Sequence, residues 1–312
     1  MAHYIVTGGA GFVGSNIVHA LVKKNVKVTV IDNLSTGKIS NLKDIKSKIT
    51  FIKGDITNLS LLMKAFKAGS LVLHQAALPS VPRSIQNPVK TAQNNEMGTL
   101  NVLTAAVKKK VKRVVYAASS SAYGEQKTAK KNEQLYPQPK SPYAISKFTG
   151  ELYCQNFYEI YGLETISLRY FNVFGSYQNP DSQYAAVVPK FITAILEQKR
   201  PIIYGDGLQT RDFTHVENVI KANMLACQAP RKALGKVYNV ACGQNINLNK
   251  LLIVIKKKLN SEIKPIYKAS RPGDVKHSLA DISLAKKYLR YKPEIDFSTG
   301  IDLTINWYKS NA

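Results

Sequence analysis

The 312-residue sequence has few cysteines, few acidic residues and no long apolar run. Its three cysteines, Cys154, Cys227 and Cys242, are far apart and form no CxxC or CxxH pair, which argues against a disulfide framework and against a metal site. No apolar stretch reaches the roughly 18 residues of a membrane span, and a glycine-rich turn stands where a signal peptide would need its apolar core. We therefore expect a cytoplasmic protein with no membrane partner.

Acidic residues are outnumbered by basic ones: 20 Asp and Glu stand against 44 Lys and Arg, so the net charge is +24. Such a charge could attract nucleic acid or an anionic substrate. However, the lysines are scattered in short groups, such as 108–110 and 256–258, mostly at the ends or outer faces of expected helices, and no aromatic residues alternate with them. This pattern favours a solvated, lysine-rich surface and no nucleic-acid partner.

The stretch TGGAGFVG at residues 7–14 lies between a short apolar run and a helical pattern over 16–22. Glycines at this GxxGxxG spacing let the backbone approach a pyrophosphate, and the helix N-terminus adds N–H donors and partial positive charge. A second apolar run, 26–31, ends in Asp32, whose carboxylate would accept hydrogen bonds from a ribose diol and repel a 2′-phosphate. The pattern predicts a dinucleotide site that prefers NAD to NADP.

Apolar runs alternate with helical patterns, which predicts a doubly wound parallel sheet with ligands at the carboxyl ends of its strands. The expected strands are residues 4–6, 26–31, 49–52, 71–74 and 113–118, with a return to the sheet at 236–240. A helix is expected from about 88 to 109, and an amphipathic helix over 248–259. Asp55 is compatible with two roles, contact with an adenine or a cap for the next helix. We interpret His74 as structural.

Two groups of residues carry chemistry at this edge of the sheet. Serines 119–121 end the fifth strand, and Pro142 opens a helix on which Tyr143 and Lys147 lie one turn apart. An unperturbed tyrosine has a pKa of about 10 and is a poor base at neutral pH. A nearby ammonium and an oxidised nicotinamide would favour the phenolate, so the spacing predicts that Tyr143 is a general base.

Together, TGGAGFVG, the serine triplet with Tyr123 and Gly124, and SPYAISK resemble the extended short-chain dehydrogenase/reductase family. The resemblance continues through RYFNVFG, YGDG, RDFTHV and RPGD, so it covers nearly the whole chain. Within the family the sequence is most similar to NAD-dependent UDP-hexose 4-epimerases. The stretches HQAALPSVPRS and GDVKHSLAD are similar to the subgroup that acts on UDP-N-acetylglucosamine (UDP-GlcNAc) and UDP-N-acetylgalactosamine (UDP-GalNAc).

The resemblance implies a Rossmann-type α/β fold with two parts. The NAD-binding doubly wound parallel sheet would occupy residues 1–168, with return segments near 212–242. A smaller C-terminal α/β domain, mainly 169–312, would bind the UDP-sugar. A homodimer is also implied, through a four-helix bundle formed by the helices around 88–109 and 143–161.

The same resemblance implies the site residues. The catalytic residues would be Tyr143, Lys147, Ser119 and Ser120. The NAD-binding residues would be Gly8, Gly11, Phe12, Val13, Asp32, Asn33, Ser35, Thr36, Gly37, Asp55, Ile56, Gln75, Ala76, Ala77, Asn95, Tyr143, Lys147 and Tyr170. The substrate-binding residues would be Ser80, Val81, Ser119, Ser121, Tyr143, Asn172, Val187, Val188, Ile203, Tyr204, Arg211, Arg271, Asp274 and Ser278. Arg211 and Arg271 would clamp the diphosphate as guanidinium forks.

By resemblance, NAD stays bound and the sugar passes through a 4-keto form. Tyr143 takes the proton of the 4-hydroxyl while the C4 hydride passes to the nicotinamide; the ketose then turns about its diphosphate and hydride returns to the other face. Ser119, four residues before Tyr123, would hold the same oxygen, with the register inside the serine triplet open by one residue. Lys147 would bind the nicotinamide ribose and acidify Tyr143.

Substrate choice is expected to depend on Ser278. Epimerases limited to unsubstituted hexoses have a bulky tyrosine there, near the sugar C2, so the small serine leaves room for an N-acetyl group. The hypothesis is turnover of UDP-GlcNAc and UDP-GalNAc, with UDP-glucose and UDP-galactose as further substrates. The sequence departs from the subgroup at Pro79, because the subgroup often has glycine before Ser80, and this leaves the local geometry open.

Three alternatives stay open. The first is a 4-epimerase of UDP-glucuronate or UDP-galacturonate. The second is a related nucleotide-sugar decarboxylase or 4,6-dehydratase; the dehydratases carry an Asp-Glu pair where this chain has Ser120 and Ser121, which cannot serve as acid and base at neutral pH. The third, from another class, is a non-catalytic NAD-binding regulator, against which the intact Ser119, Tyr143 and Lys147 speak.

Overall fold

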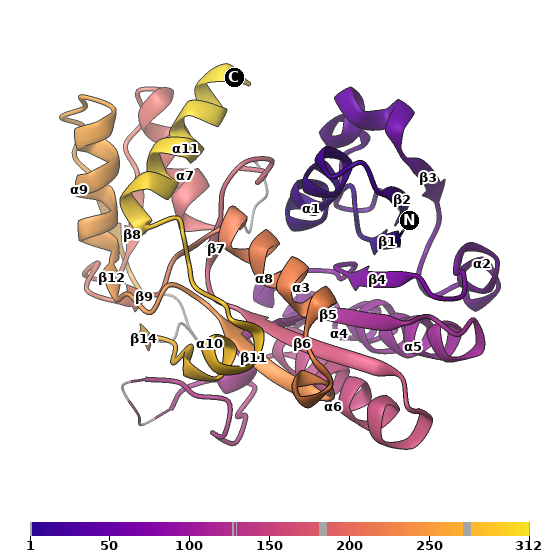
Figure 1. Cartoon of the computed structure of the whole chain (residues 1–312). Helices are drawn as coiled ribbons and strands as arrows, with labels where there is room; N and C mark the ends of the chain where they lie inside the picture. Colours follow the sequence, from indigo (N-terminus) through magenta and orange to yellow (C-terminus); the bar gives the residue numbers. More distant parts are fainter. Residues whose placement is uncertain (1, 127, 129, 181–185, 271–275, 312) are drawn as a thin grey trace.

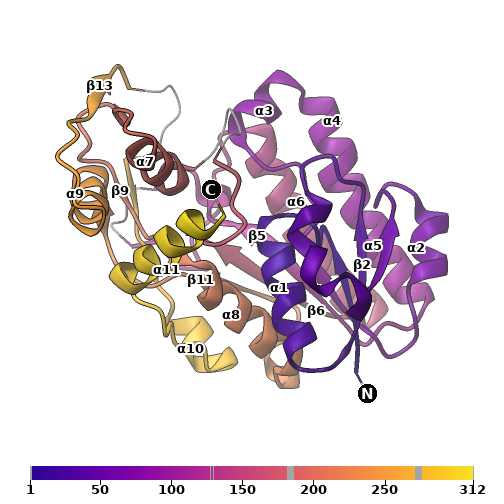
Figure 2. The same ribbon diagram turned by 90° about the horizontal axis from the view of Figure 1, so that it is seen from above.

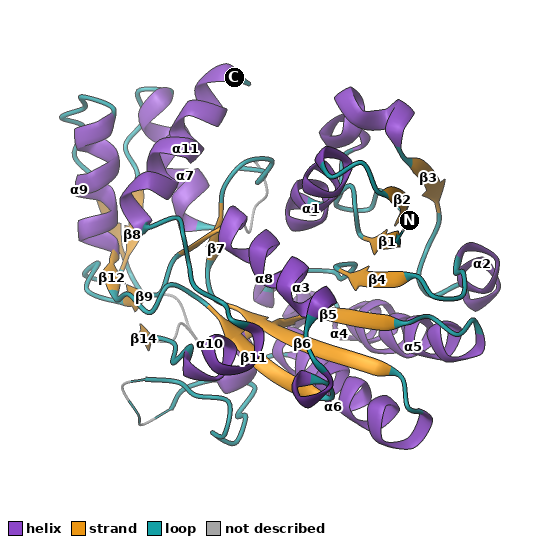
Figure 3. Ribbon diagram, viewed as in Figure 1, coloured by secondary structure: helices purple, strands orange, loops and turns teal. Residues whose placement is uncertain are grey.

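A parallel sheet of seven strands forms the centre of the chain in the computed structural model, which describes residues 2–126, 128, 130–180, 186–270 and 276–311 (Figures 1 and 3). In spatial order the strands are β11 (Lys236–Val240), β6 (Glu164–Tyr170), β5 (Arg113–Ser119), β4 (Leu71–His74), β1 (His3–Thr7), β2 (Lys27–Asp32) and β3 (Thr50–Lys53). The order reverses between β1 and β4, and ligands of such sheets bind at that point. The predicted Rossmann-type sheet is confirmed.

The strands read as apolar runs because both faces of the sheet are covered. One face carries α1 (Phe12–Lys23), α8 (Val216–Gln228) and α10 (Ser283–Leu289). The other face carries α2 (Leu59–Ala65), α5 (Gly98–Lys108) and α6 (Pro142–Tyr161). Parallel pairing aligns Thr7 with His74 and Ser119 with Tyr170, so the carboxyl ends of the central strands meet at one edge.

A second part, with its own hydrophobic core, lies beside this edge, at the left of Figure 2. Its helices are α7 (Val187–Leu196), α9 (Leu248–Lys258) and α11 (Phe297–Ser310). Its short strands are β8 (Ile202–Tyr204) with β13 (Ile266–Lys268), and β9 (Thr210–Arg211) between β12 (Ile246–Asn247) and β14 (His277–Ser278). A further pair, β7 (Val173–Phe174) and β10 (Thr214–His215), joins the two parts.

The remaining elements are short: η1 (Ile39–Lys48), α3 (Val81–Gln86), α4 (Pro88–Ala92), the π-turn η2 (Gln93–Met97), η3 (Ser120–Tyr123) and η4 (Arg231–Ala233). The expected helix from 88 to 109 is therefore divided into α4, η2 and α5. A return of the chain to the large sheet was expected near 212–242. Residues 280–291 also return, since they join the core between the sheet and the helices α1, α8 and α10. No helix in the described part of the chain combines the length and the apolar character needed to cross a membrane.

Candidate active site

The glycine-rich turn is pressed against the loop that follows β4. Gly8 has φ +69°, and a Cβ built on it would lie 2.6 Å from the backbone nitrogen of Ala76. A Cβ on Gly14 would lie 2.1 Å from the carbonyl oxygen of Gly8. Gly11 is the N-cap of α1, and no side chain caps this helix. The backbone at the start of α1 is therefore open to an anionic ligand, as at other phosphate-binding helix termini.

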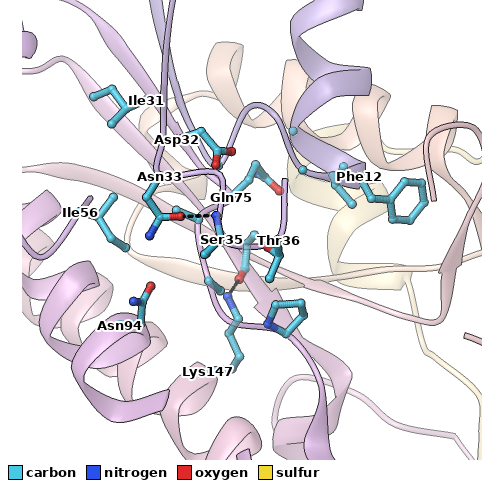
Figure 4. A pocket seen from close by; sticks show the side chains of 18 of the residues that line it. Phe12, Ile31, Asp32, Asn33, Ser35, Thr36, Ile56, Gln75, Asn94 and Lys147 are labelled. Carbon is cyan, nitrogen blue, oxygen red and sulfur yellow. Dashed lines mark hydrogen bonds between the residues drawn. The ribbon is translucent and has the colours of Figure 1, made fainter. Parts of the chain in front are cut away.

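A cavity lies over this turn at the carboxyl ends of the central strands (Figure 4). Most residues expected to bind NAD line it: Gly8, Gly11, Phe12, Val13, Asp32, Asn33, Ser35, Thr36, Ile56, Gln75, Ala76, Ala77, Tyr143, Lys147 and Tyr170. Gly37, Asp55 and Asn95 do not line it. Residues that sequence reasoning missed are Gly14, Ile31, Gly54, Pro79, Asn94, Ala117 and Ala118.

The acidic residue after β2 is oriented by backbone donors. Asp32 Oδ2 accepts the N–H of Ala10 at 2.9 Å, and Oδ1 accepts the N–H of Leu34 at 2.8 Å. A carboxylate oxygen has two acceptor sites, so each keeps one for a ribose hydroxyl. With the glycine cradle and the uncapped helix, this donor and acceptor set fits the pyrophosphate and adenosine ribose of NAD.

Asp55 does not line the cavity but is hydrogen-bonded to a residue that does. Its Oδ2 accepts a hydrogen bond from Asn33 Nδ2 at 2.7 Å, and Asn33 lines the cavity. The alternative in which Asp55 caps the next helix is wrong, because the N-cap of α2 is Asn58, whose side chain accepts the N–H of Leu61. Asp55 therefore orients a cavity residue instead of capping a helix.

Within the π-turn η2, Asn94 and not the expected Asn95 lines the cavity. Asn95 is buried, with its amide bonded to both backbone groups of Leu78 and to Ser146 Oγ at 3.0 Å. The preceding Asn94 lines the cavity instead. A π-turn inserts an extra residue into the helical phase, so ordinary periodicity points to the wrong member of such a pair.

Tyr143 and Lys147 face the cavity from the first turns of α6. Ser141 begins this helix, since its Oγ accepts the N–H of Ala144 at 3.2 Å, and Pro142 follows as the first helical residue. Lys147 Nζ donates to the carbonyl of Ala117 at 2.9 Å. Burial lowers the pKa of Lys147 to about 8.

The phenol of Tyr143 lies beside the side chain of Ser119. Burial raises the pKa of Tyr143, and the polar contact with Ser119 lowers it. The ammonium of Lys147 donates to the carbonyl of Ala117 on β5. The acidification of Tyr143 by Lys147 and an oxidised nicotinamide stays a prediction.

The three serines of the triplet have different environments. Ser119 Oγ accepts the hydroxyl of Ser121 at 2.9 Å and the N–H of Ser121 at 3.2 Å. Ser120 begins the 3-10 turn η3. Of the three serines, Ser119 is the one that acts on the pKa of Tyr143.

A second cavity, of about 430 Å³, opens in the C-terminal part. The expected substrate residues Val81, Asn172, Val187, Val188, Tyr204 and Arg211 line it. Ile203 is fully buried in the hydrophobic core of the C-terminal part, while its neighbours Ile202 and Tyr204 line the cavity. The expected residues Arg271 and Asp274 lie outside the described residues.

Arg211 and Ser278 are paired across two short strands. The parallel register of β14 and β9 sets Ser278 opposite Arg211. Arg211 Nη1 donates to the carbonyl of Thr210 at 2.9 Å. Ser278 is 7% exposed, so any bulk added to its side chain would have to be accommodated within packed structure.

A third cavity, of about 870 Å³, borders the other two. It shares Phe12 and Pro79 with the first cavity and Ala186 with the second. Arg83 and Lys38, which sequence reasoning also missed, bring positive charge to its wall. Neighbouring cavities thus extend from the glycine turn to Arg211.

Ser80, on the wall of the third cavity, has a strained backbone. Its φ is +97°, a region that favours glycine, and its Oγ accepts the N–H of Arg83 at 3.4 Å as the N-cap of α3. The presence of Pro79 instead of glycine left the local geometry open. The structure shows that Ser80 itself adopts the positive φ, with a proline before it.

Comparison with known proteins gives consistent findings. Residues 4–241 match the model of the NAD dependent epimerase/dehydratase family. The chain is 39% identical over 309 residues to a putative UDP-glucose 4-epimerase of Methanocaldococcus jannaschii, with 98% of each chain covered. It is 43% identical, with a TM-score of 0.95, to the structure of UDP-N-acetylglucosamine 4-epimerase from Methanobrevibacter ruminantium in complex with UDP-N-acetylmuramic acid, covering 100% of this chain and 99% of that one. It is 31% identical, with a TM-score of 0.91, to UDP-glucuronic acid 4-epimerase from Bacillus cereus in complex with UDP-glucuronic acid and NAD, covering 99% of this chain and all of that one.

Proposed function

The chain belongs to the NAD dependent epimerase/dehydratase family, and from that premise we propose that it inverts carbon C4 of a UDP-hexose, with UDP-GlcNAc and UDP-GalNAc as its main substrates. One observation carries the proposal: Tyr143, which lies beside Ser119, lines the same cavity as Lys147 and the glycine turn. NAD is the coenzyme of this family. When bound, it supplies reversible transfer of a hydride at the sugar C4.

The residues of the chain divide the remaining work. The turn around Gly8 and Gly11 and the start of α1 hold the pyrophosphate, and Asp32 holds a ribose. Tyr143 Oη removes the proton of the sugar 4-hydroxyl as a 4-keto sugar forms, and returns that proton when the keto group is reduced. Ser119 Oγ holds the same sugar oxygen against Tyr143.

Inversion requires a firmly held diphosphate and a loosely held sugar. Arg211, at the wall of the second cavity, is a guanidinium fork suited to a diphosphate. The keto sugar then turns about the diphosphate link and presents its other face. Lys147 lines the first cavity, with the glycine turn, and would hold the nicotinamide ribose.

Ser278 supports the choice of N-acetylated sugars. Its side chain is small and lies opposite Arg211 in the strand register, and the related structure from Methanobrevibacter ruminantium holds an N-acetylated UDP-sugar. The runner-up is a 4-epimerase of uronic acids, which the likeness to the Bacillus cereus enzyme supports.

The deciding experiment is a panel of UDP-sugars assayed for C4 inversion without added NAD. We expect turnover of UDP-GlcNAc and UDP-GalNAc and a loss of roughly 10²–10⁴-fold in kcat for Tyr143→Phe. Tyr161→Phe, an exposed change on the same helix, serves as the control. Turnover confined to UDP-glucuronate would establish the runner-up, and salt-sensitive DNA binding without turnover of any sugar would favour a regulator.

Specificity has its own test. Ser278→Tyr is expected to lower kcat/KM for the N-acetylated sugars at least about tenfold more than for UDP-glucose, because crowding one substituent out of a pocket typically discriminates by about 1–3 kcal/mol. Ser278→Ala keeps the space and should retain both activities. Equal losses on both classes of sugar in Ser278→Tyr would contradict the assignment.

A further inference from the structure

A buried carboxylate lies one helical turn beyond the active-site lysine. Lys147 and Glu151 are four residues apart on α6, which places them on one face of the helix, and they are 4% and 2% exposed. Both Glu151 oxygens accept hydrogen bonds from Arg169: Oε1 from Nε at 2.9 Å and Oε2 from Nη2 at 2.6 Å. Two oxygens that both accept from a guanidinium form the fork geometry of an ionised carboxylate.

This arrangement is costly if its only role is stability. Three charged side chains are withdrawn from water, and replacing buried ion pairs with apolar residues of similar volume is often neutral or stabilising. Arg169 also lies over the ring of Tyr123, 4.4 Å from the ring centroid, directly beyond the serine triplet. The fork therefore fixes the carboxylate one helical turn from the lysine.

Glu151 is the only anion that faces Lys147 among the described residues. The ammonium lies 5.0 Å from the ring centroid of Tyr116 on β5. The other titratable groups around it are uncharged near pH 7, because burial shifts each pKa away from neutrality: upward for Tyr116 and Tyr143, upward to about 12 for Cys154, and downward to about 3 for His74. Burial raises the pKa of Glu151 and the fork with Arg169 lowers it, and Glu151 is the carboxylate that opposes the fall in the pKa of Lys147.

The charge of Lys147 needs such support. Its Nζ has one hydrogen-bond acceptor in the described structure, the carbonyl of Ala117. Burial lowers its pKa to about 8, and the nearby Glu151 opposes that shift. An opposite charge nearby typically moves a pKa by about one unit or more, so its loss would lower the pKa of Lys147 further and raise the neutral fraction of the lysine at pH 7 to 8.

We propose that Glu151 is a positioning residue, oriented by Arg169, that keeps the Lys147 ammonium charged and directed at the coenzyme cavity. The importance of that charge for turnover rests on the proposed function. The state of the lysine itself can be measured independently of any sugar.

The test follows lysine titration by NMR in protein labelled with ¹³C at lysine Cε. Lys131 is a built-in reference, because burial lowers its pKa to about 8 as well, whereas the charges that act on it are those of Arg211 and Glu125. Lys147→Arg and Lys131→Arg assign the two signals. In Glu151→Gln we expect the Lys147 signal to titrate at least about one pH unit lower and the Lys131 signal to stay in place. An unmoved Lys147 signal, or an equal movement of both, would overturn the proposal.

Matched variants separate charge support from loss of stability. Glu164→Gln breaks a second Arg–Glu pair, formed with Arg113 at 2.7 Å between β6 and β5, and should destabilise the protein without moving the Lys147 titration. If Glu151→Gln fails to fold, Glu151→Gln combined with Arg169→Met avoids an unpaired buried cation and should show the same shift.

Activity gives a second reading. With a UDP-sugar that the wild type turns over, the alkaline fall of kcat should begin about one pH unit lower in Glu151→Gln than in Glu164→Gln. Wild-type protein without turnover would refute the proposed function, and the NMR titration would still decide the role of Glu151.

Discussion

At the scale of single residues, the buried His74 makes the stability of the fold depend on pH below neutrality. It ends β4 with both ring nitrogens bonded, to Thr7 Oγ1 at 2.7 Å and to Thr99 Oγ1 at 3.0 Å, as its structural interpretation predicted. Burial lowers its pKa to about 3, against about 6.5 in an unfolded chain. Between these values the unfolded state binds a proton that the native state does not, so the free energy of unfolding falls as the pH falls below about 6.5.

We predict that His74→Asn flattens this dependence. Each such group contributes a slope of up to about 1.4 kcal/mol per pH unit, so denaturant unfolding measured from pH 6.5 to 4.5 should lose that much slope in the variant. His215, whose pKa burial lowers to about 4, keeps a residual slope in place. His277, exposed on β14, supplies the control, and His277→Asn should follow the wild type. An unchanged slope in His74→Asn would refute the assignment.

At the scale of elements, one buried carboxylate joins the short strands that carry the substrate residues. Asp212 follows β9 and accepts the N–H groups of Cys242 and Gly243 at 3.0 Å and of Ala280 at 3.2 Å. Ala280 lies two residues after Ser278, and Arg211 precedes Asp212 directly. The Asp212 side chain therefore adds a link between strands that already pair through their backbones and carry the proposed substrate residues.

We predict that Asp212→Ala lowers stability and weakens substrate binding. Three N–H groups lose their acceptor, and that of Ala280 is buried while those of Cys242 and Gly243 are partly open to water, so the free energy of unfolding should fall by about 1–3 kcal/mol. Because Arg211 and Ser278 lose their mutual support, KM for the UDP-sugar should rise more than kcat falls. Asp206→Ala removes an exposed carboxylate that accepts the N–H of Leu208 in its own turn, and it should leave both constants near the wild type. A kcat loss with unchanged KM would contradict this role.

These short strands also show what the sequence could not predict. The long strands of the sheet were predictable because burial on both faces turns each into an apolar run. The two-residue strands β9, β12 and β14 have no periodicity to detect, since their pairing comes from distant backbone partners and from Asp212. The coenzyme turn was predictable because its glycines are adjacent in sequence. The cavity that joins the two parts was not, because its walls combine Phe12, Arg83 and Trp307.

At the scale of the whole molecule, apolar side chains gather on one face although the chain is strongly basic. Ile85 on α3 and Val89 on α4 are 63% and 65% exposed, and Ile145 and Leu152 on α6 are 48% and 50% exposed. The three helices pack side by side on one side of the sheet. Single exposed apolar residues are ordinary, but a contiguous group on neighbouring helices is typical of a protein interface.

We predict that two copies of the chain pair through this face, so light scattering should report twice 34.6 kDa for the wild type. Val89→Glu combined with Leu152→Glu should give monomers, because carboxylates would be buried without partners. Ile253→Glu, at an equally exposed apolar residue on α9, should remain dimeric. Each chain carries +24, so pairing works against charge repulsion, and salt that shortens the Debye length from about 30 Å at 0.01 M to about 10 Å at 0.1 M should strengthen the dimer. A wild-type monomer at both salt concentrations, or dissociation in Ile253→Glu, would show that this apolar face is not the interface.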